Sequence, residues 1–331
     1  MRRIFGWALI ACALTAALPG WAADRMTIIV GGADKQIYLP ATLAERLGYF
    51  REQGLEVEMQ SESSGVSAAD VLLAGAAHGV IGAYDHTIDL QAKDKFVQSV
   101  VQFSRAPGEA VVVDVRKADA ILSPADFRGR RLGVTGLGSS THLLVQYLAA
   151  AHGVRGGDVT FLGAGSGDAF VAALRSGRIE AGMTTEPTLS RLLKSGGARL
   201  LVDLRTPERA SAELGGSYPG ACLYMSLPWI RTHRDEVQRL AHALVKALRY
   251  IDRHGADEIA AQLPAAYMAG DRVLYVGTLQ LSKSMFTADG VMPADGPANV
   301  LRVMRIAERA VAGKPIDLAQ TYTTEFALAA R

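Results

Sequence analysis

Two stretches of the chain, 54–75 and 156–177, repeat one pattern at an offset of 102 residues. Each has a glycine, a β-type run, a Ser-Gly pair, a helix-length segment and a closing glycine. Six identities in 22 gapless positions exceed the roughly two expected by chance at ordinary residue frequencies. The chain is therefore predicted to contain two similar α/β units.

Short β-type runs alternate with helix-length stretches along most of the chain, which predicts α/β layers with mainly parallel strands. Strands are expected at 26–30, 55–60, 79–83, 96–103, 110–115, 131–134, 159–162, 182–184, 200–203 and 221–226. Helices are expected at 39–47, 66–74, 140–151, 168–176 and 186–194, and through the last third. There, apolar residues at three- and four-residue steps mark one buried helix face: Val237, Leu240, Leu244, Val245, Leu248 and Ile251.

The N-terminus has the order of a secretory signal: Arg2 and Arg3, an apolar run from Ile4 to Leu18, then Pro19 and small residues. The run is shorter than the roughly 20 residues of a membrane span. We expect a signal peptide over 1–22, with cleavage after Ala23 as an alternative. Leu9-Ile10-Ala11-Cys12 resembles a lipoprotein box, but only eight apolar residues precede Cys12, so lipid anchoring is not favoured.

Charge and cysteine content narrow the function classes. Lys and Arg number 35 against 33 Asp and Glu among 331 residues, and removal of 1–22 leaves 33 against 33. A neutral chain lacks the electrostatic footprint of a nucleic-acid binder. Cleavage would leave Cys222 as the one cysteine, so no intramolecular disulfide can form and a buried, inert thiol is expected.

A glycine-rich turn, 132–141, links a predicted strand to a predicted helix. Free N–H groups and the positive dipole at a helix start can bind a small anion, and hydroxyls follow Gly138 at Ser139, Ser140 and Thr141. Simple helix capping is the alternative. The turn lacks the Gly-Lys-Ser/Thr ending of a P-loop and a strict GxGxxG, so a nucleotide site is not predicted.

Further candidates follow other predicted strands, where ligand residues of open α/β sheets usually lie. Each has a plain structural alternative, such as a solvated turn, a helix cap or a surface arginine. If both acidic candidates face the cleft, the ligand would need a donor or cationic group besides any anionic one. Ser217-Tyr218 is a weaker candidate. The candidates are Gln36, Tyr38, Tyr84, Asp85, Ser104, Arg105 and Glu186.

Enzyme signatures are missing from the sequence. The seven histidines are scattered, and there is no HExxH, no CxxC and no G-x-S-x-G elbow. No catalytic residue, metal or cofactor is therefore expected, although a triad assembled from distant residues stays open.

Several segments together resemble the nitrate/sulfonate/taurine-type branch of periplasmic solute-binding proteins of ABC transporters, a family that also has pyrimidine-precursor-binding members. The matching segments are 39–50 with 54–57, 126–134 leading into 138–141, and 177–181 followed by Glu186-Pro187. The resemblance implies a type II periplasmic-binding fold with a hinged cleft, 23–113 and 222–331 forming lobe 1 and 114–221 forming lobe 2. It also implies that Ser139, Ser140 and Thr141 contact an anion. Thr185 stands where many relatives have an aromatic residue.

The expected function is capture of a small, sulfonate- or carboxylate-like ligand by hinge closure, and its delivery to an inner-membrane permease by a monomeric periplasmic protein. Closure follows because only the closed state lets a ligand contact both lobes. A periplasmic ligand sensor and a pyrimidine-precursor-handling enzyme on the same fold are the alternatives.

Overall fold

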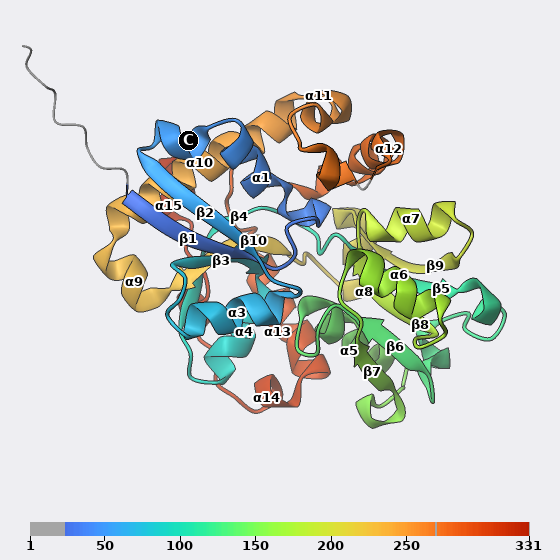
Figure 1. Cartoon of the computed structure of the whole chain (residues 1–331). Coiled ribbons are helices and arrows are strands. Elements are labelled where there is room, and N and C mark those ends of the chain that lie inside the picture. The colour runs from blue at the N-terminus through green and yellow to red at the C-terminus, as the bar shows by residue number, and fades with distance from the viewer. Residues whose placement is uncertain (1–23, 269, 331) are drawn as a thin grey trace, which may run out of the picture.

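The computed structural model describes residues 24–268 and 270–330. The predicted signal peptide, with Cys12, lies outside the described residues. Figure 1 shows two sheets side by side, each in its own lobe with helices packed on it. In the described part of the chain, no helix is both long and apolar enough to cross a membrane. The arrangement is the two-lobed α/β fold that the sequence predicts.

The sheet of the first lobe has five strands in the order β2-β1-β3-β10-β4. β1 is parallel to β2 and β3, whereas β10 is antiparallel to both β3 and β4. Every strand but β10 therefore runs in one direction. The strands are β1 (Asp24–Val30), β2 (Leu55–Ser61), β3 (Gly79–Ala83), β4 (Val97–Gln102) and β10 (Ala221–Ser226).

The sheet of the second lobe repeats this topology in the order β7-β6-β8-β5-β9, with β5 as the antiparallel strand. All ten predicted strands are present, with ends shifted by no more than two residues. Helix α6 and strand β8 lie 102 residues after α3 and β3, as the repeat predicts. The strands are β5 (Glu109–Asp114), β6 (Arg131–Val134), β7 (Thr160–Gly163), β8 (Ala181–Thr185) and β9 (Ala198–Leu204).

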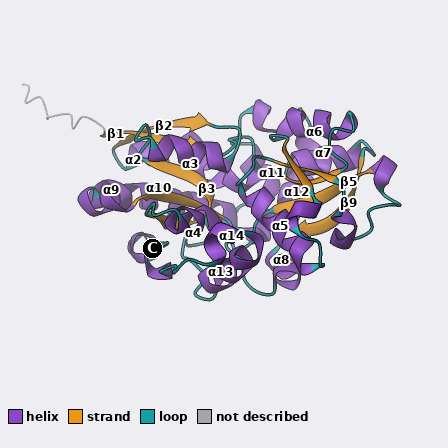
Figure 2. Cartoon of the chain, turned by 90° about the horizontal axis from the view of Figure 1, so that it is seen from below, coloured by secondary structure: helices purple, strands orange, loops and turns teal. Residues whose placement is uncertain are grey.

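Helices cover both sheets (Figure 2). The five individually predicted helices are found as α1, α3, α5, α6 and α7, but α2, α4 and α8 were not predicted. The helices before the last third of the chain are α1 (Leu39–Arg46), α2 (Tyr49–Glu52), α3 (Gly65–Leu73), α4 (Asp85–Ala92), α5 (Ser140–Ala151), α6 (Gly167–Arg175), α7 (Thr188–Lys194) and α8 (Pro207–Leu214).

The last third is helical, as predicted, and it returns to the first lobe after β10. All six apolar residues predicted for one face of a long helix are buried on α10. Helix α13 packs against α5 of the second lobe, so the C-terminal part also bridges the lobes. The helices are α9 (Leu227–Thr232), α10 (Arg234–Arg253), α11 (Ala256–Ala260), α12 (Arg272–Ser282), α13 (Gly296–Ala307), α14 (Arg309–Ala312) and α15 (Glu325–Ala329).

The chain crosses between the sheets twice, after β4 (103–108) and before β10 (215–220). The crossings lie against each other, because Gly220 N–H donates to Ser104 O and the Gln102 side-chain amide donates to Ser104 O and Gly220 O. The boundary predicted after residue 113 thus falls one strand late. β5 looks like a first-lobe strand in sequence, but it pairs between β8 and β9.

Candidate functional site

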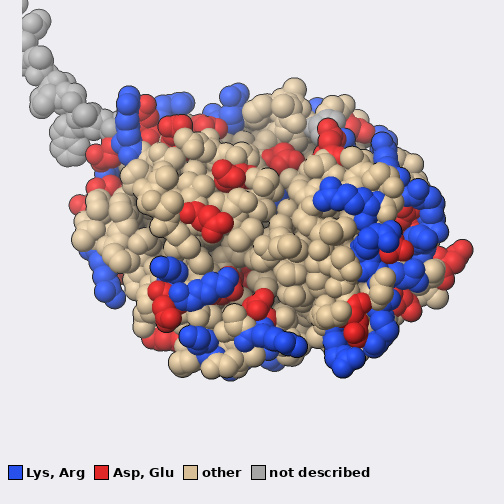
Figure 3. Space-filling view, turned by 60° about the horizontal axis from the view of Figure 1, so that its bottom comes forward, with Lys and Arg blue, Asp and Glu red and all other residues tan. Residues whose placement is uncertain are grey.

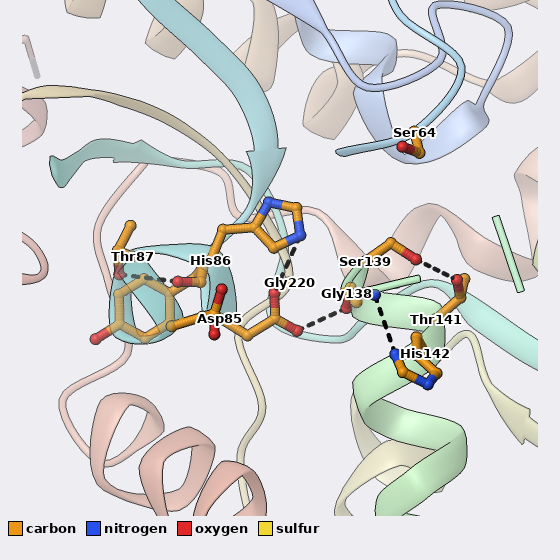
Figure 4. Close-up of polar contacts among 12 residues, drawn as sticks. Ser64, Asp85, His86, Thr87, Gly138, Ser139, Thr141, His142 and Gly220 are labelled. Atoms are coloured by element: carbon orange, nitrogen blue, oxygen red, sulfur yellow. Dashed lines mark hydrogen bonds and ion pairs between the residues drawn. The ribbon is translucent and has the colours of Figure 1, made fainter. Parts of the chain in front are cut away.

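Polar side chains meet where the carboxyl ends of strands from both lobes face each other, the usual ligand position in open α/β sheets. The first lobe contributes Asp85 and His86 at the start of α4, directly after β3. The second contributes the turn from β6 into α5. Figure 4 shows this turn, Gly138 to Thr141, opposite Asp85 and His86. The lobes touch here, since a Cβ added to Gly136 would lie 2.8 Å from Ser64 Oγ.

Asp85 lies at the centre of this junction and is fully buried. Its Oδ2 accepts hydrogen bonds from Ser140 Oγ of the second lobe (2.7 Å) and from the Tyr218 hydroxyl beside the second crossing (3.0 Å). Its Oδ1 has no hydrogen-bond partner, and His86 Nε2 is 3.9 Å away. A buried carboxylate with an unpartnered oxygen is costly to maintain. Asp85 is therefore a candidate ligand contact.

Glu109, the first residue of β5, is a second buried carboxyl group at the junction. Its Oε2 has no hydrogen-bond partner. Burial, then the charge of nearby Asp85, raises the pKa of Glu109 well above its usual range, although Lys35 and Ser140 act in the opposite direction. Two carboxyl groups from different lobes thus share one dry environment.

The loop after β1 supplies Lys35, a buried cation whose charge acts on Glu109. Its ammonium donates to Gly31 O. Burial lowers the pKa of Lys35, although Glu109 partly opposes this. Tyr38 is also buried, and burial together with Glu109 and Asp85 raises its pKa well above the usual value. Lys35 and Tyr38 are therefore close enough to the carboxyl pair to sense its charge.

Gln36 joins the lobes through its backbone, whose N–H donates to Glu186 O (3.0 Å). Its side chain bonds instead to Thr278 and Ser282 of α12. This predicted residue thus borders the junction, while its amide group is held by the first lobe.

The glycine-rich turn is organised by its own side chains. Thr141 Oγ1 accepts the Thr135 N–H, and the Ser139 hydroxyl bonds to Thr135, Thr141 and the Gly136 backbone. Burial lowers the pKa of His142, in line with its Nδ1 accepting the Gly138 N–H (3.0 Å). Of the three predicted hydroxyls, Ser140 is the one that reaches across the junction. The group it meets there is the carboxylate of Asp85.

Glu186 is also buried but is fully engaged within its lobe. Its Oε1 accepts from Arg205 Nη1 (2.7 Å) and Ser190 Oγ, and its Oε2 accepts the Ser190 N–H. Arg205 also holds Asp203 through two hydrogen bonds. The side chain of Glu186 is thus part of a buried ion-pair network, and the backbone carbonyl is what meets the first lobe.

Three other predicted residues lie away from the carboxyl pair. Tyr84 donates to, or accepts from, Thr321 near the C-terminus (2.6 Å). Ser104 Oγ bonds to Ala106 O and Ala221 N, which fastens the two crossings. Arg105 is exposed and donates to Ser284 O.

Sequence analysis named Tyr218 as a weaker candidate, and its candidate residues do not include Lys35, His86, Glu109 or Arg205. One signal was available for Glu109, a single acidic residue at the entrance to the apolar run 110–113. The position of Arg205 beside Glu186 depends on how β9 pairs with β5, which the sequence does not reveal.

Neither the charged surface residues nor the Cys222 thiol adds another kind of functional group to this site. The face in Figure 3 is mainly uncharged across its middle, with Lys and Arg gathered toward one end. Cys222 is buried in β10, as predicted from the sequence, and burial raises its pKa to about 12. Among the described residues, no group of three or more His, Cys, Asp or Glu is arranged to hold a metal ion.

Comparison with known proteins places this architecture in a family. Residues 37–256 match the family model described as NMT1/THI5 like. The chain belongs to the NMT1/THI5-like family. A solved protein of Bordetella bronchiseptica RB50, itself similar to this NMT1/THI5-like chain, has 36% identity and a TM-score of 0.89, with 93% of this chain and 96% of that chain covered. A comparison with curated proteins gives no match.

More distant solved structures share the fold of this NMT1/THI5-like protein. The alkanesulfonate-binding protein SsuA from Xanthomonas axonopodis pv. citri, bound to MOPS, is 19% identical with a TM-score of 0.71, covering 92% of this chain and 98% of its own. The periplasmic nitrate-binding protein NrtA from Synechocystis PCC 6803 is 12% identical with a TM-score of 0.73, covering 93% and 88%. The predicted resemblance and fold class are thus confirmed.

Proposed function

We propose that this chain is the solute-binding component of an ABC importer and captures a small molecule between its two lobes in the periplasm. The observation that carries the proposal is the buried junction, where Asp85 and Glu109 come from different lobes and each has an unpartnered oxygen. A ligand that contacts both lobes favours the state in which they meet. The NMT1/THI5-like family and the binding proteins among the fold relatives support this function.

The paired crossings support a hinge. Both chain segments between the lobes pass one point, where Ser104 O accepts the Gly220 N–H. The two backbone segments pack closely at this point, since a Cβ added to Gly220 would lie 2.5 Å from Ala106 O. Rotation about two adjacent segments would separate the lobes without disturbing either sheet. The side-chain contacts between the lobes include Ser140 with Asp85, and Lys194 with Asp271 at the N-cap of α12.

Ligand capture is tested on protein produced from residue 23 onward. A thermal-shift screen against sulfonates, nitrate, carboxylates, amino acids, amines and pyrimidines should find one class that raises the melting temperature. Small-angle scattering with and without that compound should show a smaller radius of gyration when it binds. A bound compound that leaves the radius unchanged would argue against hinge closure.

Export and delivery need separate tests. N-terminal sequencing of protein recovered from the periplasm should begin at Ala23, or at Asp24 if the alternative cleavage is used. Import of the identified compound by a permease and ATPase encoded beside this chain should require the chain. If the neighbouring genes instead encode a membrane kinase or cyclase and no transporter, the sensor alternative would replace transport.

A further inference from the structure

The charge balance at the lobe junction indicates the chemical class of the ligand. Asp85 is 0% exposed and Glu109 is 4% exposed, and each has one oxygen without a hydrogen-bond partner. An isolated buried charge is strongly unfavourable unless it is paired and hydrogen-bonded. A carboxyl pair in this condition lacks a partner, and a ligand that enters between the lobes could supply one.

The cations near the pair donate hydrogen bonds to other groups, although the charge of Lys35 still acts on Glu109. Lys35 donates to Gly31 O, Arg105 lies at the surface against Ser284 O, and Arg205 holds Asp203 and Glu186. His86 Nε2 is unpartnered, but its 3.9 Å distance from Asp85 Oδ1 is too long for a hydrogen bond. Among the described residues, Asp85 accepts side-chain hydrogen bonds from the hydroxyls of Ser140 and Tyr218.

The start of α5 is a poor place for an anionic group when the lobes meet. The Ser139 and Thr141 hydroxyls are bonded within the turn, and Ser140 donates to Asp85. A sulfonate or carboxylate at this position would therefore lie beside the Asp85 carboxylate. Like charges at short range repel strongly where water is excluded.

We propose that the ligand carries a nitrogen cation with several N–H donors, such as an amidinium, guanidinium or primary ammonium group, held between Asp85 and Glu109. This inference rests on the proposed solute-binding function. N–H donors that carry positive charge form short, strong hydrogen bonds to carboxylates. One such group would satisfy the free oxygens of both lobes at once, so its binding would favour closure.

The titration of Glu109 gives the inference a second consequence. The groups that bear on Glu109 are Asp85, Lys35 and Ser140, and Glu109 in turn affects the pKa of Tyr38 and of Tyr218. Burial and Asp85 raise the pKa of Glu109 without ligand, which favours its protonated form. A bound cation favours the carboxylate instead. Binding should therefore release a proton, and affinity for the cation should increase as the pH rises through the raised pKa of Glu109.

The test is isothermal titration calorimetry with sets of probes that share one carbon skeleton. One set is benzamidine, benzamide, benzoate and benzenesulfonate, and a second is butylamine, guanidinobutane, butyrate and butanesulfonate. The expected result is that at least one cation binds at least tenfold more tightly than the carboxylate and sulfonate of its set. Titration of that cation in two buffers of different ionisation enthalpy should show proton release.

The variants Asp85→Asn and Glu109→Gln keep the side-chain shape and should each weaken binding of that cation at least tenfold. Glu109→Gln should also abolish the proton release, which a purely structural role would not do. Glu213→Gln, an exposed acidic residue on α8, is the matched control and should change neither. Far-UV circular dichroism and melting temperature establish that each variant is folded.

Two outcomes would overturn the inference. Tighter binding of a carboxylate or sulfonate, with Asp85→Asn strengthening it, would assign an anionic ligand and leave the solute-binding function intact. Absence of binding by every cation would also reject the inference. In that case, native mass spectrometry of the exported protein tests the proposed function independently. A co-purified small molecule would support ligand capture. A protein that is reproducibly ligand-free, and that no screened compound stabilises, would argue against it.

Discussion

The two lobes place a carboxylate at nearly the same point of the same topology and use it differently. Asp85 follows β3 in the first lobe, and Glu186 follows β8 in the second, one residue apart at the 102-residue offset. Glu186 is held by Arg205 and by two hydrogen bonds from Ser190. Asp85 accepts hydrogen bonds from two hydroxyl groups, and its other carboxyl oxygen has no hydrogen-bond partner.

This difference teaches that burial of an acidic residue after a strand does not by itself indicate a ligand contact. The deciding observation is whether the protein provides a cation for it. In the second lobe the end of β9 brings Arg205 to both Asp203 and Glu186, so the charge is balanced locally. In the first lobe, no Lys or Arg among the described residues bonds to Asp85, and its Oδ1 has no hydrogen-bond partner.

The largest expected effect comes from removing the cation of the second lobe. Arg205→Met leaves the buried Glu186 without its cation and leaves half-buried Asp203 with Arg209 alone, which should cost about 3 to 5 kcal/mol of unfolding free energy. Urea denaturation measures it. Arg209→Met is the control, because Arg209 also contacts Asp203 but is 60% exposed, and its loss should stay within about 0.5 kcal/mol. Equal effects of the two changes would contradict the assignment of Arg205 as the central partner.

The next largest expected effect is the difference in stability between variants of Glu186 and of Asp85. Glu186→Gln removes a charged acceptor of Arg205 and should lower the unfolding free energy by about 2 kcal/mol, the range for hydrogen bonds to charged groups. Asp85→Asn removes a buried carboxyl group that no Lys or Arg pairs and that lies 3.9 Å from His86 Nε2, so stability without ligand should stay equal or increase. Thermal unfolding of both variants checks this. A large loss of stability for Asp85→Asn would show that the protein itself compensates this carboxylate.

The sequence predicted most of the fold because its buried strands are short apolar runs between glycines, and these runs stay recognisable without tertiary information. The lobe boundary was displaced by one strand because β5 and β10 are the antiparallel members, and their sheet depends on pairing with distant strands. Asp85 and Ser140 were predicted from their positions after strands. Glu109 was not, because its role depends on Asp85 from the other lobe, 24 residues earlier in the sequence.

A third prediction uses pH to distinguish two carboxyl groups of the second lobe, Asp203 on β9 and Glu109 on β5. Burial alone would raise the pKa of Asp203, but hydrogen bonds and charge from Arg205 lower it below its usual range, so its stabilising contribution is present above the ordinary aspartate pKa and is lost as pH falls through the depressed one. The contribution of Glu109 to stability changes with pH in the opposite direction. Its pKa is raised, so its contribution is present below the ordinary glutamate pKa and is lost as pH rises through the raised value.

Melting temperatures without ligand, measured across pH, should therefore decline on both sides. Glu109→Gln should flatten the decline on the alkaline side and leave the acid side unchanged. The other titratable groups around Glu109, namely Asp85, Lys35, Tyr38 and Tyr218, remain in this variant. A decline that persists in Glu109→Gln would assign the alkaline loss to one of them.

The smallest effect concerns the one turn hydroxyl that crosses the junction. Ser140→Ala removes the 2.7 Å hydrogen bond to Asp85 and should weaken contact between the lobes by about 0.5 to 1.5 kcal/mol, with the closed population falling accordingly. Single-molecule energy transfer between dyes on the two lobes measures that population. Ser139→Ala is the matched control, because the Ser139 hydroxyl bonds within the turn, so its loss should lower the melting temperature and leave the lobe distance unchanged. If Ser139→Ala opens the lobes as much as Ser140→Ala does, the turn acts through its shape and not through the contact with Asp85.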